Sequence, residues 1–201
     1  FMKSLQLRSV WILALAGAVA AGSVWNAKVA SAAPKYLGPS PMVASADGNR
    51  LAIACSDAEQ VVTIDLASGK ILARTDVPAE PTGLAFDGQG KLYVTCAAPE
   101  STVCVIDAAG KIVGRFAAGH TAIGPCLAPD GKRLYVCNRF NNDVSVIELP
   151  SGKTLKRIKA VREPYVAAIT PCGKTLLVAN HLPNDRADSY DVAAKIGRAH
   201  V

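Results

Sequence analysis

Short apolar runs alternate with polar turns through most of the chain, and the pattern repeats about every 40 residues. A leucine opens one of these runs in each repeat, and successive copies are 41, 42 and 42 residues apart: Leu51, Leu92, Leu134 and Leu176. A second marker, isoleucine before an acidic residue, keeps nearly the same spacing at residues 64, 106 and 147. Such a repeat indicates one supersecondary unit used several times, because a single unit cannot bury both of its apolar faces.

The second repeat shows how each unit is built. Its apolar runs cover residues 83–86, 92–96, 103–106 and 112–114, and Asp87-Gly88 separates the first two. Asp-Gly favours a tight hairpin, because glycine accepts positive φ and aspartate bonds to its own backbone. Ten-residue amphipathic segments are missing, which excludes a helical solenoid. The pattern predicts an all-β protein, a β-propeller of four-stranded antiparallel blades.

The repeats divide the chain into about four blades, of which the last is incomplete. The predicted bounds are residues 39–79, 80–121, 122–162 and 163–194. The fourth strand of the third unit carries Lys156, Arg157 and Lys159. Charge of this kind suits an outer edge strand, where it discourages edge-to-edge aggregation.

Two of the second strands carry a motif that resembles a known family. Leu92-Tyr-Val-Thr-Cys96 and Leu134-Tyr-Val-Cys-Asn138 resemble the YVTN β-propeller repeat, with cysteine in the Asn place of the first and in the Thr place of the second. The flanking Ala128-Pro-Asp-Gly-Lys132 matches the same pattern. The resemblance implies a secreted or surface propeller. It implies little about activity, because its motifs are structural. Residues 178–194 also look like YVTN propellers that precede a di-haem cytochrome-peroxidase-like region.

The N-terminal segment has the pattern of a secretory signal peptide. Lys3 and Arg8 precede an apolar stretch at residues 10–21, and Ala30-Ser31-Ala32 follows as a cleavage site. We expect a signal peptide over residues 1–32 and an exported protein in the periplasm, at the cell surface or outside the cell. After cleavage no membrane span is expected. An uncleaved anchor is the alternative.

The last residues have a different character. Residues 196–201, Ile-Gly-Arg-Ala-His-Val, are what a common sequencing adapter encodes, so we predict that residues 195–201 are a non-native tail. A genuine terminus is the alternative. The fourth unit is then expected to stop after its second strand and a long loop, where a third strand is due.

Charge and cysteine content exclude some classes of function. The net charge of +6 is scattered among turns without basic runs next to aromatic residues, so no nucleic-acid partner is expected. Of the six cysteines, Cys55, Cys96 and Cys137 occupy second-strand positions of three different blades, too far apart for disulfides. Buried free thiols are the favoured interpretation, and an interblade bridge between Cys104 and Cys126 is the alternative.

Candidate binding residues cluster in loops that a propeller brings to one face. These loops connect the second strand to the third, or one blade to the next. The candidates are His120, Asn138, Arg139, Asn180, His181, Asp185, Arg186 and Asp188. The alternative is that they are solvated turn residues, and that Asn138 and Asn180 cap strand ends.

The fourth-unit loop, residues 181–191, is longer than its counterpart at 139–143, and such insertions often mark a binding side. Its histidine and aspartates can also coordinate a cation, although they lack an EF-hand pattern.

No catalytic motif is present. G-x-S-x-G and H-E-x-x-H are missing, as is C-x-x-C-H, so neither a catalytic residue nor a cofactor or metal site is predicted in this stretch. We expect a binding or docking scaffold for a protein partner or an adjoining domain. The alternative is the propeller portion of a periplasmic haem-containing oxidoreductase, with haem motifs beyond the C-terminus. A lactonase-like hydrolase is disfavoured, because its inner strands would need acidic metal ligands.

Overall fold

The computed structural model describes residues 36–182 and 196–200. Contacts divide the chain into one unit at residues 1–34 and another at 35–201, and only the second contains described residues. The described part is built from strands, with a single 3₁₀ turn, η1 (Arg139–Asn141). Among these residues, no helical segment reaches the length and apolarity that a membrane crossing requires.

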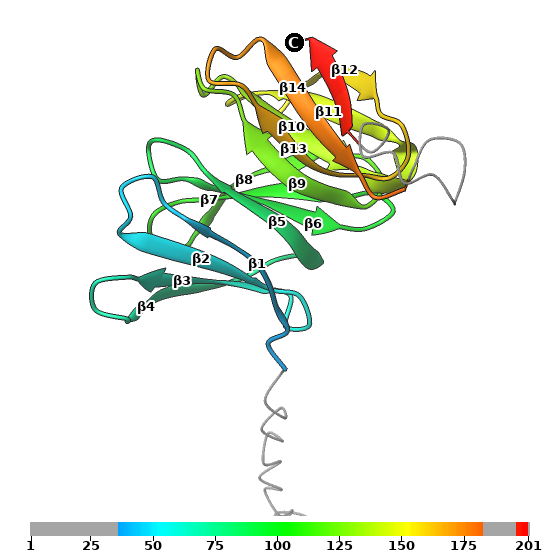
Figure 1. Ribbon diagram of the computed structural model, residues 1–201. Helices are drawn as coiled ribbons and strands as arrows, with labels where there is room; N and C mark the ends of the chain where they lie inside the picture. The colour runs from blue at the N-terminus through cyan, green and yellow to red at the C-terminus, as the bar shows by residue number, and fades with distance from the viewer. Residues whose placement is uncertain (1–35, 183–195, 201) are drawn as a thin grey trace, which may run out of the picture. The chain divides into compact units, whose positions relative to one another are not determined.

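The strands form four antiparallel sheets, and within each sheet they are ordered as along the chain (Figure 1). The first sheet contains β1 (Pro39–Ala44), β2 (Arg50–Cys55), β3 (Gln60–Asp65) and β4 (Ile71–Asp76). The second contains β5 (Glu80–Phe86), β6 (Leu92–Ala97), β7 (Thr102–Ile106) and β8 (Ile112–Ala117). The third contains β9 (Ala122–Leu127), β10 (Arg133–Asn138), β11 (Asp143–Glu148) and β12 (Thr154–Lys159). The fourth contains β13 (Pro164–Ile169), β14 (Thr175–Asn180) and β15 (Ile196–His200).

The sheets pack as successive blades. The first strand of each blade lies next to the first strand of the following blade. Thus β5 contacts both β1 and β9, and β9 also contacts β13. Apolar side chains fill each space between neighbouring sheets, as where Tyr93 and Val103 of the second meet Leu134 and Val136 of the third. Burial on both faces explains why β6 and β10 read as continuous apolar runs. The predicted all-β propeller architecture is confirmed.

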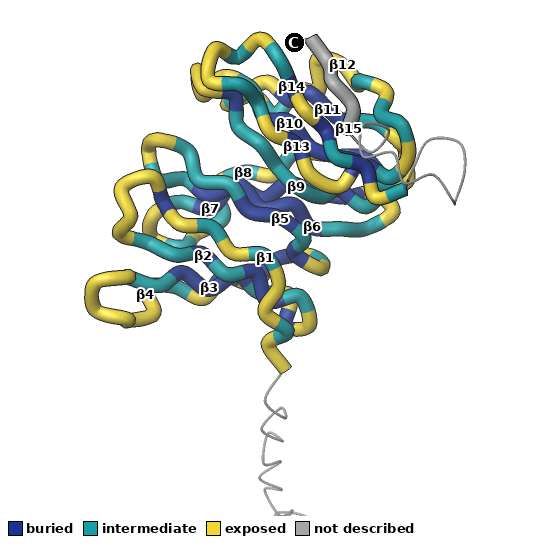
Figure 2. Tube along the Cα trace, in the orientation of Figure 1, coloured by how far each residue is buried: buried dark blue, intermediate teal, exposed yellow. Residues whose placement is uncertain are grey.

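The outer strands differ from the middle ones, as predicted from their polarity. Exposed and half-buried residues alternate along β8, and five of the six residues of β12 are exposed. Figure 2 shows the buried residues gathered in the middle strands, with β4 and its turn at the surface. Lys156 and Arg157 therefore lie on an exposed edge.

The hairpin turns follow the predicted chemistry with one correction. Gly48 and Gly131 adopt φ of 70° and 68° directly after an aspartate. In the second blade the positive φ belongs to Gly90, at 81°, and not to Gly88. There the turn begins at Asp87 itself, since Asp87 N–H bonds to Lys91 O and Asp87 O accepts the Gly90 N–H, so the left-handed position falls on Gly90.

The fourth sheet departs from the sequence prediction. Residues 196–200, expected to be a non-native tail, form β15 and pair antiparallel with β14, from Ala179↔Ile196 to Thr175↔His200. An open sheet edge offers unpaired N–H and C=O groups, and an extended segment of almost any sequence can satisfy them. Residues 1–32, predicted to be a signal peptide, and residues 183–195 lie outside the described residues.

Candidate binding face

The predicted loops do meet at one end of the blades. We define the loop face by six side chains from the second, third and fourth blades: His120, Arg139, Phe140, Glu163, Tyr165 and His181. The first four come from connections, Tyr165 belongs to β13 and His181 follows β14. Their positions are set by hydrogen bonds between neighbouring blades.

The η1 turn joins the second and third blades. Arg139 N–H donates to Thr121 O at 3.1 Å, and His120 N–H donates to Asn141 Oδ1 at 2.6 Å. The His120 ring meets the Phe140 ring edge-on, with centroids 5.2 Å apart. His120 Nδ1 also lies 2.9 Å from Thr121 Oγ1. The turn thus fixes an imidazole and an aromatic ring side by side.

Asn138, the residue before this turn, fixes the local backbone through side-chain hydrogen bonds. It is fully buried at the end of β10, and its Oδ1 accepts the Gly119 N–H at 2.8 Å. Its Nδ2 donates to Asp143 Oδ1 at 2.5 Å and to Ser145 Oγ at 2.7 Å. Asn138 is therefore a positioning residue within the protein. The bond from Gly119 N–H to its side chain is the strand-end capping role that was considered as the alternative for Asn138.

Glu163 connects the third blade to the fourth. Its carboxylate pairs with Arg139, with Arg139 Nη2 at 2.7 Å and Nε at 2.8 Å from Oε2. Its N–H donates to Asn142 Oδ1 at 2.8 Å, and its carbonyl accepts the His181 N–H at 2.8 Å. Its φ of 47° lies in the left-handed region, a conformation that non-glycine residues hold only when the surroundings impose it.

Two half-exposed aromatic rings give the loop face its apolar surface. Phe140 is 53% exposed and Tyr165 47%. The Arg139 guanidinium lies 5.2 Å from the centroid of the Phe140 ring, and the Tyr165 ring lies 5.9 Å from the His181 ring. Tyrosine and arginine are among the residue types enriched at the energetic centre of protein interfaces.

A hollow of about 530 Å³ begins beside Arg139 and Tyr165 and runs over the first strands of the blades. Its polar lining includes Glu80, Thr82 and Thr121. Thr82 Oγ1 already donates to Ala122 O at 2.6 Å, so that hydroxyl ties β5 to β9. The loop face therefore borders a concave surface, which Arg139 and Tyr165 help to line.

The structure places five of the eight predicted binding residues. His120, Arg139 and His181 lie on the loop face, whereas Asn138 and Asn180 are buried. Asp185, Arg186 and Asp188 lie outside the described residues. Sequence reasoning missed Phe140 and Tyr165; one available signal was a bulky ring within the polar loop at residues 139–143.

All six cysteines are free, as favoured from the sequence, but only four are buried as expected: Cys126 is half-buried and Cys172 is exposed. Cys104 and Cys126 form no interblade bridge. Cys96 and Cys104 instead meet within the second blade, with sulfurs 4.0 Å apart. The hydrogen bond that Cys96 donates lowers the pKa of Cys104, and Arg115 acts in the same direction against burial. The same hydrogen bond, together with burial, raises the pKa of Cys96.

Within the described part of the chain, no three His, Cys, Asp or Glu side chains converge as metal ligands. The aspartates considered with His181 as cation ligands, at positions 185, 188 and 191, lie outside the described residues.

The fold and this end of the blades define a β-propeller protein. No family model matches the chain, and no curated protein sequence does so either. Among solved structures, the chain is similar to hydrazine synthase of Kuenenia stuttgartiensis, with a TM-score of 0.68 and 23% sequence identity. The match covers 83% of this chain and 50% of that one, so this chain spans about half the length of its structural neighbour. At this identity the likeness shows the fold alone.

Proposed function

We propose that this chain is an exported YVTN-type β-propeller that acts as a scaffold, with the loop face as its binding site for a protein partner or an adjoining domain. The observation that carries the proposal is that the η1 turn brings Arg139 and Phe140 to the same end of the blades as Tyr165 of β13, where Arg139 and Tyr165 line one hollow. Hydrogen bonds to the connection between the second and third blades hold the backbones of Arg139 and Phe140 in place, so this turn has little ordering entropy left to lose on binding.

The chemistry of the loop face suggests the kind of partner. Arg139 and Glu163 neutralise one another, so the face presents apolar rings framed by an ion pair. Such a surface suits a protein segment that inserts an apolar or aromatic side chain beside Phe140 and places polar groups on the rim. It offers little to nucleic acid, whose binding depends on uncompensated positive charge.

A capture experiment tests the scaffold role. Full-length protein is compared with a loop-face variant, His120→Ala with Phe140→Ala and Tyr165→Ala, using envelope extract. The matched control changes Gln89, Lys132 and Lys153 to Ala, exposed residues in turns at the other end of the blades. A partner retained by wild type and control, lost by the loop-face variant, and rebound when purified supports the proposal. Equal recovery of every protein by all three contradicts it.

The undescribed part of the fourth-blade loop is tested separately. A variant with His181, Asp185 and Arg186 changed to Ala is expected to fold normally and to bind the same partner more weakly. Recovery of that partner at the wild-type level would remove this loop from the proposed site.

The second candidate is the propeller portion of a periplasmic haem-containing oxidoreductase. Two points favour it: the likeness of residues 178–194 to propellers before di-haem regions, and a structural neighbour that is named as an enzyme and of which the match covers only half. The test is the coding sequence downstream of Ala194. C-x-x-C-H motifs there, with haem bound to the purified product, would favour the oxidoreductase, whereas further repeats alone would favour the scaffold.

A further inference from the structure

A pocket of about 370 Å³ lies between the third and fourth blades. Its walls come from two turns, residues 128–130 before β10 and residues 171–173 before β14, and from Arg133 and Tyr135 of β10. The loop face follows β10 and β14, so this pocket lies at the opposite end of the blades. A space of this size accepts a small organic molecule and exceeds what one bound water fills.

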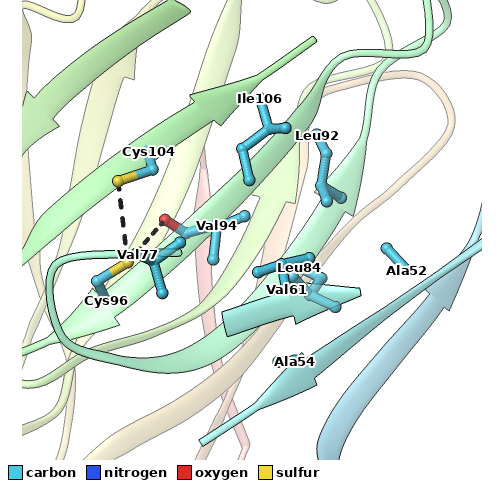
Figure 3. Packing of buried hydrophobic residues seen from close by; sticks show 10 residues of the cluster. All are labelled: Ala52, Ala54, Val61, Val77, Leu84, Leu92, Val94, Cys96, Cys104 and Ile106. Carbon is cyan, nitrogen blue, oxygen red and sulfur yellow. Dashed lines mark hydrogen bonds between the residues drawn. The ribbon is translucent and has the colours of Figure 1, made fainter. Parts of the chain in front are cut away.

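The repeat explains why a pocket opens here. Between the first and second blades apolar side chains pack closely (Figure 3), and the Arg50 guanidinium lies 5.4 Å from the centroid of the Phe86 ring. Arg133 has the place of Arg50 in the third blade, directly before the leucine that opens the apolar run. Ile169 has the place of Phe86 in the fourth, because each pairs with the opening leucine of its own blade. An isoleucine offers no ring to a guanidinium, and Arg133 instead lines the pocket.

One polar group at the pocket lacks a partner: the Tyr135 hydroxyl, which is fully buried and makes no hydrogen bond. The Arg133 guanidinium beside it can only donate, so the phenolic proton finds no acceptor there. In the second blade the equivalent hydroxyl, that of Tyr93, lies beside the Asp87 carboxylate. Ala128 replaces this aspartate in the third blade, since the N–H groups of both residues make the same turn-closing bond. A ligand in the pocket would supply the missing acceptor.

A thiol lies at the open side of the same pocket. Cys172 is exposed, and its sulfur is 3.3 Å from Thr170 Oγ1. The next residue, Gly173, lies against the third blade, where a Cβ would come within 3.9 Å of Pro129 Cδ. The pocket thus combines a guanidinium, a phenol, a thiol and, in Asp130, a carboxylate.

We propose that this pocket binds the disulfide of a small amino-acid thiol, such as cystine, and that Cys172 exchanges with it to form a mixed disulfide. The carboxylate of the ligand pairs with Arg133 and accepts the Tyr135 O–H, and its ammonium group faces Asp130. The Cys172 thiolate attacks one ligand sulfur, a new S–S bond forms, and the S–S bond of the ligand breaks. The leaving thiolate takes up the proton that Cys172 released. One disulfide is consumed and one is formed, so no further oxidant is needed.

The protonation states of the two reacting groups suit this exchange. Burial raises the pKa of Tyr135 and outweighs the opposing effect of Arg133, so the hydroxyl keeps the proton that it donates. Hydrogen bonds from the Thr170 hydroxyl and then the Lys174 N–H lower the pKa of Cys172, which increases its thiolate fraction. Donor and nucleophile are both in the form that the reaction requires.

The experiment follows Cys172 in the reduced full-length protein by mass spectrometry of the peptide that contains it. The rate of its modification by cystine is divided by its rate with hydroxyethyl disulfide, which has no charged group, to give a selectivity. A synthetic peptide of residues 170–174 has the same thiol without the pocket and is the reference. The selectivity of the protein should exceed that of the peptide at least about tenfold, as a hydrogen-bonded charge pair typically contributes.

Three variants locate the source of this selectivity, each checked for folding by circular dichroism. Arg133→Ala should lower the selectivity to that of the peptide. Tyr135→Phe should lower it several-fold and should fold normally, because the hydroxyl that it removes has no partner. Lys132→Ala removes a neighbouring exposed charge that does not line the pocket, and it should leave the selectivity unchanged.

Three results would overturn the proposal. The first is a selectivity of the protein no greater than that of the peptide. The second is a selectivity that survives both Arg133→Ala and Tyr135→Phe, and where Arg133→Ala does not fold, Tyr135→Phe decides alone. The third is an equal loss in Lys132→Ala, which would mean that general surface charge and not the pocket attracts the ligand.

Discussion

At the scale of single residues, the blades are joined at positions where a side chain replaces a missing backbone partner. Asn138 closes the junction of the second and third blades by accepting the Gly119 N–H. Ser101, in the loop between β6 and β7, supports the same junction, since it accepts the N–H groups of Ala98 and Ala122 at 3.1 and 2.9 Å. Buried polar groups with all their partners make such junctions specific, and loss of one partner is costly.

Gly119 is predicted to be intolerant of a side chain. A Cβ there would clash with the side chains of Asn138 and Asn141. Gly119→Ala should lower the free energy of unfolding by about 1–3 kcal/mol, as other overpacked sites do. Urea denaturation measures the free energy of unfolding of this variant. Gly88→Ala is the control, because a Cβ at Gly88 meets nothing within 4 Å. Equal free energies of unfolding for the two variants would contradict the prediction, because Asn138 and Asn141 would then move to accommodate the Cβ.

Cys172 is predicted to be the most reactive thiol. It is exposed, and hydrogen bonds from the Thr170 hydroxyl and then the Lys174 N–H lower its pKa. A lowered pKa means more thiolate at neutral pH, so alkylation should be faster than for an ordinary exposed thiol. Thr170→Val should raise the pKa and shift the pH–rate profile of alkylation upward. A profile that does not move would contradict this assignment.

At the scale of elements, the stability of a blade resides in its middle strands. Leu134 in β10 is fully buried between the second and third blades, whereas Leu155 in outer strand β12 is 49% exposed. The same residue type therefore contributes very differently in the two strands, because transfer and cavity terms apply only to the buried one.

Leu134→Ala is predicted to lower the free energy of unfolding by about 2–5 kcal/mol, through the cavity it leaves. Leu155→Ala should stay within about 0.5 kcal/mol of wild type. Chemical denaturation of both variants provides the comparison. A similar loss for both would mean that the outer strand is packed more tightly than its exposure indicates.

The elements also show how far sequence reasoning reaches. Strand positions followed from period and alternation, because burial on two faces forces continuous apolar runs such as residues 92–96. The position of Gly90, the pairing of β15 and the contact between Cys96 and Cys104 did not follow, because each depends on loop length or register. Phe140 and Tyr165 were missed on the loop face, since a sequence does not show which rings remain uncovered.

At the scale of the whole molecule, the first and fourth blades each have neighbours on one side only within the described residues. In β14 the side chains of Leu176 and Val178 are buried, whereas Leu177 is 38% exposed, and Val166 of β13 is 49% exposed. The corresponding strand of the third blade, β10, is buried on both faces. Apolar surface of this kind favours association.

The chain expressed from Ala33 is therefore predicted not to form a closed, stable ring, and to associate as its concentration rises. Leu177→Lys should reduce association, because it places a charge on the uncovered face of β14. Analytical ultracentrifugation over a concentration series measures the effect. A monodisperse wild-type monomer with cooperative thermal unfolding would contradict the prediction.

The loop face as a binding site is the central claim, and site-specific photo-crosslinking in cells tests it most directly. A photoreactive phenylalanine analogue replaces Phe140 in the full-length protein, and in a second strain it replaces Lys132 in a turn at the other end of the blades. The account predicts a discrete cross-linked adduct from position 140 and none from position 132. Equal adducts from both positions, or none from position 140, would contradict it.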